Sequence, residues 1–269
     1  MIDIRLDRFT LLAVWGMLVS ANFMMSADRK NIKIYLLGGQ SNMVGQADAV
    51  NLVPPLSEPY AGVKVWNNLS GTWMPLSANG RGRFGPEIGF GHAMAKAFPF
   101  ADIRLVKYAS NGTALYDDWD PETKGPEYVA FMKAVHAAMA DLAAEGLDFE
   151  IAGMLWLQGE SDALEGMAES YQERLWRFIR HLRTEFSADG MPFIIARIRD
   201  HFGGETGQAK IVRDAQVELA ESAERIEWFD TDDLSLLDPG HYDADGLIEV
   251  GNRFAQKIID LGYKSKSEK

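Results

Sequence analysis

The strongest constraint on the fold is an alternation of short apolar runs with longer amphipathic stretches along most of the chain. Some of the apolar runs are almost continuously hydrophobic, as expected for parallel strands covered by helices on both faces. The stretches between them carry apolar residues at three- and four-residue spacing, which indicates helices. The sequence therefore predicts an α/β fold with helices around a central parallel sheet of about five strands.

The expected elements follow one another as strand and helix in turn. The long connection from Val44 to Pro86 breaks this order, and we expect it to carry a small hairpin near Val63 to Met74 and to overhang the site. The strands are predicted at Ile32 to Leu37, Ile103 to Tyr108, Ile151 to Leu157, Pro192 to Ile198 and Ile226 to Phe229. The helices are predicted at Glu87 to Ala97, Tyr128 to Ala144, Ala168 to Phe186, Gly207 to Ala223 and Asp245 to Leu261.

The N-terminus has the pattern of a secretory signal peptide. Arg5 and Arg8 precede the apolar run from Phe9 to Met25, and small residues stand before Asp28. We expect residues 1–27 to be cleaved after Ala27, leaving one domain over residues 28–269 in a secreted or periplasmic protein without a membrane segment. An uncleaved anchor and a misassigned start codon are the alternatives.

The charge and composition exclude several classes of partner and cofactor. With 27 Lys and Arg against 39 Asp and Glu, the chain lacks the basic excess that nucleic-acid binding needs. It has no Cys, no metal-binding histidine motif and no glycine-rich phosphate or dinucleotide motif. We therefore expect no metal and no cofactor.

The end of the first predicted strand offers a candidate nucleophile. In an open parallel sheet, ligands bind beyond the carboxyl ends of the strands. The string "LLGGQSNMVG" places Ser41 just after two glycines, where a tight turn can expose its hydroxyl and outward-pointing N–H groups. A Ser that caps a helix would look the same, and this string alone does not separate the two readings.

Two further strand ends are polar, and both can supply hydrogen-bond donors of the kind that an acyl-transfer enzyme needs for a developing oxyanion. The string "VKYASNGTAL" brings Asn111 and Gly112 to the sheet edge, and "MLWLQGESDA" brings Gln158 and Glu160. The Gly112 N–H, the Gln158 amide and the Ser41 N–H are the candidate donors. Helix caps and turns are the structural alternative for these residues.

A carboxylate and a histidine stand together near the C-terminus. The string "LLDPGHYDADG" places Asp238 and His241 on a Pro-Gly turn before the last helix. This spacing allows the carboxylate to hold one imidazole nitrogen while the other faces a serine, although a lone His in a turn is more often a surface residue. His201 follows a strand and is a candidate for substrate contact. Tryptophans such as Trp66, Trp73 and Trp119 suit either sugar stacking or buried packing.

Five strings, in this order and spacing, resemble the sialate O-acetylesterase-like branch of the SGNH hydrolases, which includes carbohydrate acetylesterases and acetylxylan esterases. They are "GQSNMVG", "GPEIGFG", "KYASNGTAL", "WLQGESDA" and "DPGHYDADGLIEVGNRFA". The similarity spans nearly all of Asn31 to Leu261. It implies a flavodoxin-like three-layer α/β/α sandwich and no cofactor. It also implies a serine carboxylesterase that removes O-acetyl groups from a xylan-type or sialic-acid-type carbohydrate.

The resemblance implies a role for each matching residue. Ser41 would be the nucleophile and His241 the general base, with Asp238 as its orienting partner. Ser41, Gly112 and Gln158 would form the oxyanion hole. The remaining residues of the matching strings are candidates for substrate contact or support, with Glu160 accepting hydrogen bonds beneath Ser41; they are Gln40, Asn42, Asn111 and Glu160.

This sequence departs from the wider superfamily at two positions. Asn111 stands where a glycine is frequent, so Asn111 and Gly112 are alternative oxyanion donors. Gln40 stands where other branches have an aspartate. A lipase or thioesterase acting on longer acyl chains is the alternative enzyme, and a carbohydrate-binding protein without turnover is the alternative from another class.

Overall fold

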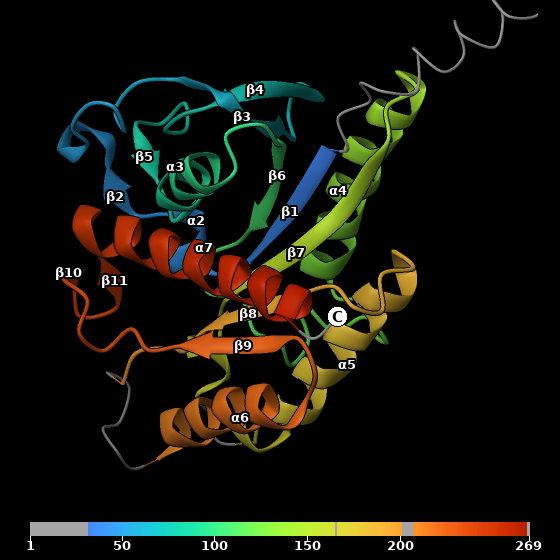
Figure 1. Ribbon diagram of the computed structural model, residues 1–269. Coiled ribbons are helices and arrows are strands. Elements are labelled where there is room, and N and C mark those ends of the chain that lie inside the picture. The colour runs from blue at the N-terminus through green and yellow to red at the C-terminus, as the bar shows by residue number, and fades with distance from the viewer. Residues whose placement is uncertain (1–31, 165, 201–206, 268–269) are drawn as a thin grey trace, which may run out of the picture.

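The computed structural model describes residues 32–164, 166–200 and 207–267. The predicted signal segment and His201 lie outside these residues. A seven-stranded sheet runs through the centre in the order β4-β3-β6-β1-β7-β8-β9 (Figure 1). Its five predicted strands are all present; they are β1 (Ile32–Gly39), β6 (Asp102–Ala109), β7 (Phe149–Leu157), β8 (Phe193–Ala196) and β9 (Ile226–Phe229).

These five strands are parallel, and their order β6-β1-β7-β8-β9 is the flavodoxin-like order 2-1-3-4-5. The strand order reverses beside β1, and this is where such sheets bind ligands. The predicted α/β sandwich is therefore confirmed, and the end of β1 is its expected site.

The predicted hairpin is present but is part of the sheet. It consists of β3 (Tyr60–Asn67), which pairs parallel with β6, and β4 (Thr72–Leu76), which pairs antiparallel with β3 at the sheet edge. The hairpin lies at the edge of the sheet, and Gln46 of the same long connection lines the pocket described below. The short helix α2 (Ser41–Val44) stands at the start of this connection, and β2 (Ala47–Asp48) and the 3-10 turn Ala49–Asn51 follow it. Strand β2 pairs antiparallel with β5 (Arg83–Phe84) and forms a separate two-stranded sheet.

Helices cover both faces of the sheet, each over its own hydrophobic core. On one face, α3 (Glu87–Ala97) packs against α7 (Ala244–Ser267), which crosses in front of the strands in Figure 1. The other face carries α4 (Pro126–Ala144), α5 (Tyr171–Glu185) and α6 (Gln208–Ser222). Helices α3, α4, α5 and α6 begin and end within three residues of their predicted bounds, because the spacing of buried residues sets them. Helix α7 continues six residues beyond its predicted end at Leu261.

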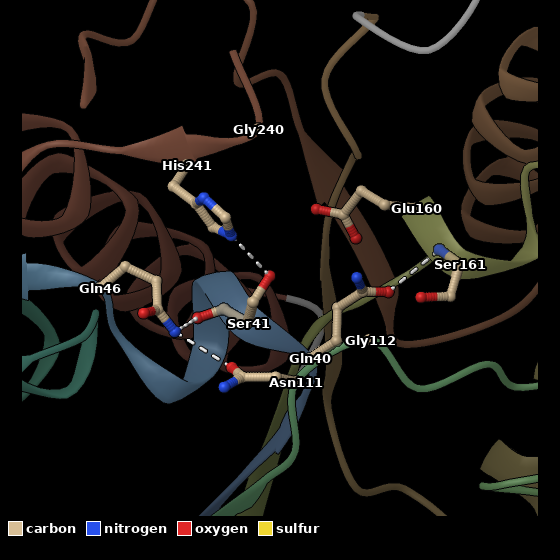
Figure 2. A pocket seen from close by; sticks show the side chains of 9 residues that line it. All are labelled: Gln40, Ser41, Gln46, Asn111, Gly112, Glu160, Ser161, Gly240 and His241. Atoms are coloured by element: carbon tan, nitrogen blue, oxygen red, sulfur yellow. Dashed lines mark hydrogen bonds between the residues drawn. The ribbon is translucent and has the colours of Figure 1, made fainter. Parts of the chain in front are cut away.

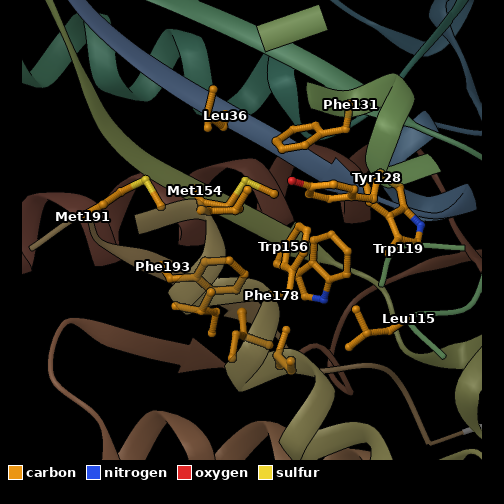
Figure 3. Packing of buried hydrophobic residues seen from close by; sticks show 14 of the residues in the cluster. Leu36, Leu115, Trp119, Tyr128, Phe131, Met154, Trp156, Phe178, Met191 and Phe193 are labelled. Carbon is orange, nitrogen blue, oxygen red and sulfur yellow. The ribbon is translucent and has the colours of Figure 1, made fainter. Parts of the chain in front are cut away.

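The core on the side of α4, α5 and α6 is rich in aromatic residues (Figure 3). Trp119 and Trp156 meet edge to face with ring centroids 5.2 Å apart, and Phe178 packs against both. These rings are fully buried and pack closely against the sheet. The strands whose polar ends form the site are therefore held by a well-packed core.

Candidate active site

Three neighbouring strands end at the same level, and this brings the sequence-predicted residues together. In the sheet, Gly39 pairs with Ala109 of β6 on one side and with Leu157 of β7 on the other. Gly39 has φ +148°, and a Cβ at this position would lie 2.1 Å from the Leu157 carbonyl oxygen. Only glycine fits this turn, which carries the chain out of β1 and into α2.

Ser41 and His241 meet in the lining of a pocket, although 200 positions separate them in the sequence (Figure 2). The distance from His241 Nε2 to Ser41 Oγ is 3.2 Å. On its other side, His241 Nδ1 lies 2.9 and 3.0 Å from the two carboxylate oxygens of Asp238. This chain of hydrogen bonds has the geometry of a Ser-His-Asp triad.

A small hairpin holds the histidine and its carboxylate. Asp238 ends β10 (Leu236–Asp238), His241 begins β11 (His241–Tyr242), and the Gly240 N–H donates to Asp238 Oδ1 at 2.8 Å. The hydrogen bond with His241 lowers the pKa of Asp238 below its usual value. Asp238 therefore stays ionised at neutral pH, in the state that favours an N–H on His241 Nδ1.

Asn42 fixes this hairpin against the segment that carries Ser41. Its amide Nδ2 donates to the Gly240 carbonyl at 3.0 Å and to Glu160 Oε1 at 3.1 Å. Its Oδ1 accepts from the Tyr242 N–H at 3.2 Å. The side chain is buried, and it makes hydrogen bonds to the backbone on both sides of His241. Asn42 thus sets the separation between Ser41 and His241.

Glu160 begins the 3-10 turn Glu160–Asp162 after β7 and lines the same pocket. Burial raises its pKa, while the hydrogen bond from Asn42 and the nearby His241 act in the opposite direction. Its second oxygen, Oε2, has no hydrogen-bond partner among the described residues. Glu160 therefore accepts a hydrogen bond from Asn42, the residue after Ser41, and Asn42 in turn contacts the hairpin at Gly240.

The loop after β6 forms another wall. Asn111 and Gly112 both line the pocket, and Gly112 has φ +66°. Asn111 Oδ1 accepts a hydrogen bond from Gln46 Nε2 at 3.0 Å, and Gln46 also donates to the Ser41 carbonyl at 3.3 Å. Arg83 holds Gln46 through a 2.7 Å hydrogen bond. Gln46 was not predicted as a site residue, because nothing in the sequence around it marks it.

Gln158 does not reach the pocket, which corrects its predicted place in the oxyanion hole. The side chain is fully buried, and its Nε2 donates to the Thr113 carbonyl at 3.0 Å and to Asp162 Oδ2 at 2.5 Å. Its Oε1 accepts from the Tyr171 hydroxyl at 3.3 Å. Both amide hydrogens are used inside the protein, so Gln158 braces the loop that carries Gly112.

Asp162 completes this brace from within the core. It accepts hydrogen bonds from the Leu115 and Tyr116 N–H groups at 2.7 and 2.9 Å. Burial is the largest influence on its carboxyl group and raises its pKa to about 6, against the three hydrogen bonds that favour the charged form. The loop after β6 is thus tied to the end of β7 by buried polar contacts.

The tryptophans proposed for sugar stacking are packed elsewhere. Trp66 and Trp119 are buried in the core, and Trp119 Nε1 donates to the Thr113 hydroxyl at 2.9 Å. Trp73 is partly buried and donates to Asp141 at 3.0 Å. None of the three lines the pocket within the described part of the chain. Packing is therefore the correct reading for these rings.

The pocket has a volume of about 420 Å³, and each residue that lines it is of a polar type or a glycine. Within residues 32–164, 166–200 and 207–267, no cluster of three acidic or histidine side chains is placed to hold a metal ion. No helix among these residues is both long and apolar enough to span a bilayer. The lining residues are Gln40, Ser41, Gln46, Asn111, Gly112, Glu160, Ser161, Gly240 and His241.

Comparison with protein families adds an independent finding. Residues 31–260 match the model of a family described as carbohydrate esterase, sialic acid-specific acetylesterase. A protein of Arabidopsis thaliana named "Probable carbohydrate esterase" is 29% identical over 259 residues, which cover 84% of this chain and 90% of the relative.

Solved structures agree with this match. The crystal structure of the Arabidopsis thaliana protein superposes with a TM-score of 0.71 and 26% identity, covering 86% of this chain and 98% of its own. A carbohydrate acetylesterase of Xanthomonas citri superposes with a TM-score of 0.66 and 19% identity, covering 86% of this chain and 57% of its own. At this identity, the second likeness shows the fold alone.

Proposed function

The chain belongs to the carbohydrate esterase family of sialic acid-specific acetylesterases, and we propose that it removes O-acetyl groups from a carbohydrate through an acetyl-enzyme intermediate on Ser41. The observation that carries this proposal is the continuous hydrogen-bond chain from Ser41 Oγ through His241 to Asp238. No other part of the pocket lining offers a nucleophile with a base on one side and an orienting carboxylate behind it.

The proposed reaction uses these groups in order. His241 Nε2 takes the Ser41 proton as Oγ attacks the acetyl carbonyl carbon. His241 then gives the proton to the sugar oxygen as the C–O bond of the ester breaks. Water, activated by the same imidazole, cleaves the acetyl-serine bond, and acetate leaves. Asp238 accepts the Nδ1 hydrogen bond throughout and stabilises the imidazolium.

The lining of the pocket favours a short acyl group. A lipase or thioesterase needs an apolar groove for its acyl chain, and this pocket has only polar side chains and glycines. Burying a long acyl chain against these groups would leave them without hydrogen bonds. The amides and hydroxyls suit the hydroxyl groups of a sugar, and sialic-acid-type and xylan-type acetates are both candidates.

The test is acetate release from O-acetyl sialic acid and from acetylated xylan. The wild-type protein should release acetate from at least one of them, and Ser41→Ala should lower kcat by about 10⁴-fold or more. Equal rates for the two proteins would reject Ser41 as the nucleophile. Binding of the acetylated glycan without release would support the carbohydrate-binding alternative, and faster cleavage of octanoyl than acetyl esters would support a lipase.

We also propose that the protein acts outside the cytoplasm, after removal of residues 1–27. The supporting pattern is the basic and apolar N-terminal sequence. N-terminal sequencing of protein recovered from the periplasm or the culture medium should begin at Asp28. A mature chain that begins at Met1 would contradict this proposal.

A further inference from the structure

Two glutamines follow neighbouring strands at the site, and their amides are used differently. Gln158 follows β7 and places both Nε2 hydrogens on Thr113 and Asp162, away from the pocket. Gln40 follows β1, directly before Ser41, and lines the pocket. The donor expected from Gln158 is therefore missing, while a second amide lies beside the nucleophile.

The orientation of the Gln40 amide is fixed by its acceptor end. Gln40 Oε1 faces two backbone donors, the Ser161 N–H at 3.2 Å and the Gly159 N–H at 3.4 Å. Turning the amide over would place NH₂ against these N–H groups, so Nε2 must point the other way. In Figure 2, Nε2 points into the space between Ser41 and Glu160.

Gln40 Nε2 has no acceptor among the described residues, and only 4% of the residue is exposed. The amide nitrogen faces the pocket and is not enclosed within the protein, so its two hydrogens are available to a bound ligand. The free N–H₂ lies in the pocket that holds Ser41 and His241. A substrate oxygen placed there would complete its hydrogen bonding.

We propose that Gln40 Nε2 is the side-chain donor of the oxyanion hole, together with the backbone N–H groups of Ser41 and Gly112. This inference rests on the proposed acetylesterase function. As the Ser41 Oγ–carbon bond forms, the carbonyl π electrons move to oxygen, and the Ser41 proton passes to His241. The oxyanion accepts from the three donors until it collapses and expels the sugar oxygen, which takes the proton from His241.

Hydrogen bonds at both its side chain and its backbone hold Gln40 in place. The Gln40 acceptor end is anchored to the Gly159–Ser161 turn, and its backbone N–H donates to the Leu157 carbonyl at 3.0 Å. A donor that is already oriented toward the oxyanion does not have to move as the negative charge develops. Oxyanion stabilisation is strong because no free energy is spent on such reorganisation. Gln40 thus joins the β1 and β7 ends and carries the free amide.

The rival role for Gln40 is a purely structural brace between these two strand ends. Two variants separate the roles. Gln40→Glu keeps the acceptor oxygen for Ser161 and Gly159 but removes the amide donor. Gln40→Met is uncharged and removes both groups at similar length. The substrate is p-nitrophenyl acetate, whose leaving group has no sugar hydroxyls, so lost sugar contacts do not contribute.

If Nε2 is an oxyanion donor, both variants should lower kcat by about 10²- to 10³-fold with little change in KM. If Gln40 is only a brace, Gln40→Glu should keep near wild-type kcat, and that result would overturn the proposal. A near wild-type kcat in Gln40→Met would overturn it as well, because the loss in Gln40→Glu would then come from the added charge.

One further explanation is that Gln40→Glu loses activity through its added charge and Gln40→Met loses activity through the lost brace. A thionoester substrate, in which sulfur replaces the carbonyl oxygen, distinguishes this explanation from the loss of an oxyanion donor. Sulfur accepts hydrogen bonds weakly, so removing an oxyanion donor should cost much less on p-nitrophenyl thionoacetate than on the oxygen ester. A brace would cost the same on both, and equal losses would overturn the proposal.

A larger loss of kcat in Gln158→Met than in both Gln40 variants would also overturn it in favour of Gln158. Thermal unfolding of each variant shows that the comparison is made on folded protein. Failure of the proposed function would look different, because the wild-type protein would then cleave neither ester faster than Ser41→Ala.

Discussion

The ends of β1 and β7 lie side by side in the sheet, and they contribute to the site in opposite ways. At the β1 end, Gln40 and Ser41 line the pocket, and the next residue, Asn42, makes hydrogen bonds to Glu160 and Gly240 at its wall. At the β7 end, Gln158 and Asp162 are fully buried and hold a neighbouring loop. Similar amides at adjoining strand ends thus serve different roles, because the backbone direction after each strand decides whether a side chain enters the pocket or the core.

An added methyl group should destabilise the turn after β1 more than the loop after β6, which the buried residues at the β7 end hold in place. Gly39→Ala puts a Cβ against the Leu157 carbonyl with φ +148°, so we expect a loss of more than about 3 kcal/mol in the free energy of unfolding, or no folded protein. Gly112 has φ +66° with open space around it, so Gly112→Ala should cost only about 1–2 kcal/mol. Urea unfolding measures both. Equal losses would show that the β1 turn is not the tighter constraint.

Asn42→Asp tests the connection from the β1 end to His241. The carboxylate can still accept from the Tyr242 N–H, but its other oxygen faces Glu160 and the Gly240 carbonyl, and repulsion should displace the hairpin. A shift of about 1 Å in a catalytic group costs up to about 10²-fold, so we expect kcat to fall by about that factor. The matched control is Asn68→Asp, whose amide bonds the Lys107 carbonyl at an exposed position and should leave kcat unchanged. Wild-type kcat in Asn42→Asp would show that Asn42 does not position His241.

Asp162 gives the β7 end a pH dependence that the β1 end lacks. Its carboxyl has a pKa of about 6 in the folded protein, above the value of 3.8 for the free group, so the folded state binds the proton more tightly than the unfolded state. The contribution of Asp162 to stability is therefore fully present below about pH 4 and is lost as pH rises through about 6. We expect this change to be on the order of 3 kcal/mol.

The check is the free energy of unfolding of the wild-type protein and Asp162→Asn between pH 4 and 8. The substituted amide leaves a backbone N–H without an acceptor, so the variant should be less stable at every pH. The gap between the two proteins should narrow as pH rises. A gap that widens with pH would mean that the charged carboxylate, rather than the protonated one, is the form that the fold favours.

Gln158 should affect stability more than Gln40 does. Gln158→Met leaves the Thr113 carbonyl and Asp162 without their buried donor, and we expect a loss of about 1–3 kcal/mol in the free energy of unfolding. Gln40→Met should lower the melting temperature less, because among the described residues only the acceptor oxygen of Gln40 has partners, at 3.2 and 3.4 Å, and its amide nitrogen has none. The opposite order of melting temperatures would contradict the division of roles between the two strand ends.

The sequence allowed the main strands, the helices and the meeting of Ser41, Asp238 and His241 to be predicted. Periodicity sets the elements, and the parallel topology then places the end of each strand at one edge. The edge strands β3 and β4 were not placed in the sheet, since the exposed residues of Tyr60–Asn67 and Thr72–Leu76 hide the pattern of a buried strand. Whether residues 28–269 form one domain stays a prediction.

The roles of individual amides were harder to predict than the elements. Residue type placed Gln158 and Gln40 at the right edge, but only the backbone after each strand shows which amide is free. The tryptophans present the same difficulty, because an indole suits a sugar ring and a protein core equally well. Gln46 carries no local signal, since its contacts depend on Arg83 and Asn111, which are distant in the sequence.

The most direct test of the central claim is covalent trapping of the nucleophile with a fluorophosphonate, which forms a stable tetrahedral adduct with an activated serine. Peptide mass spectrometry should find one adduct per chain, on the peptide that carries Ser41, with acetylesterase activity lost in proportion to labelling. The adduct should be absent from Ser41→Ala and should form much more slowly in His241→Ala. Full activity in a protein labelled at Ser41, or inactivation with the adduct on another residue, would contradict the account.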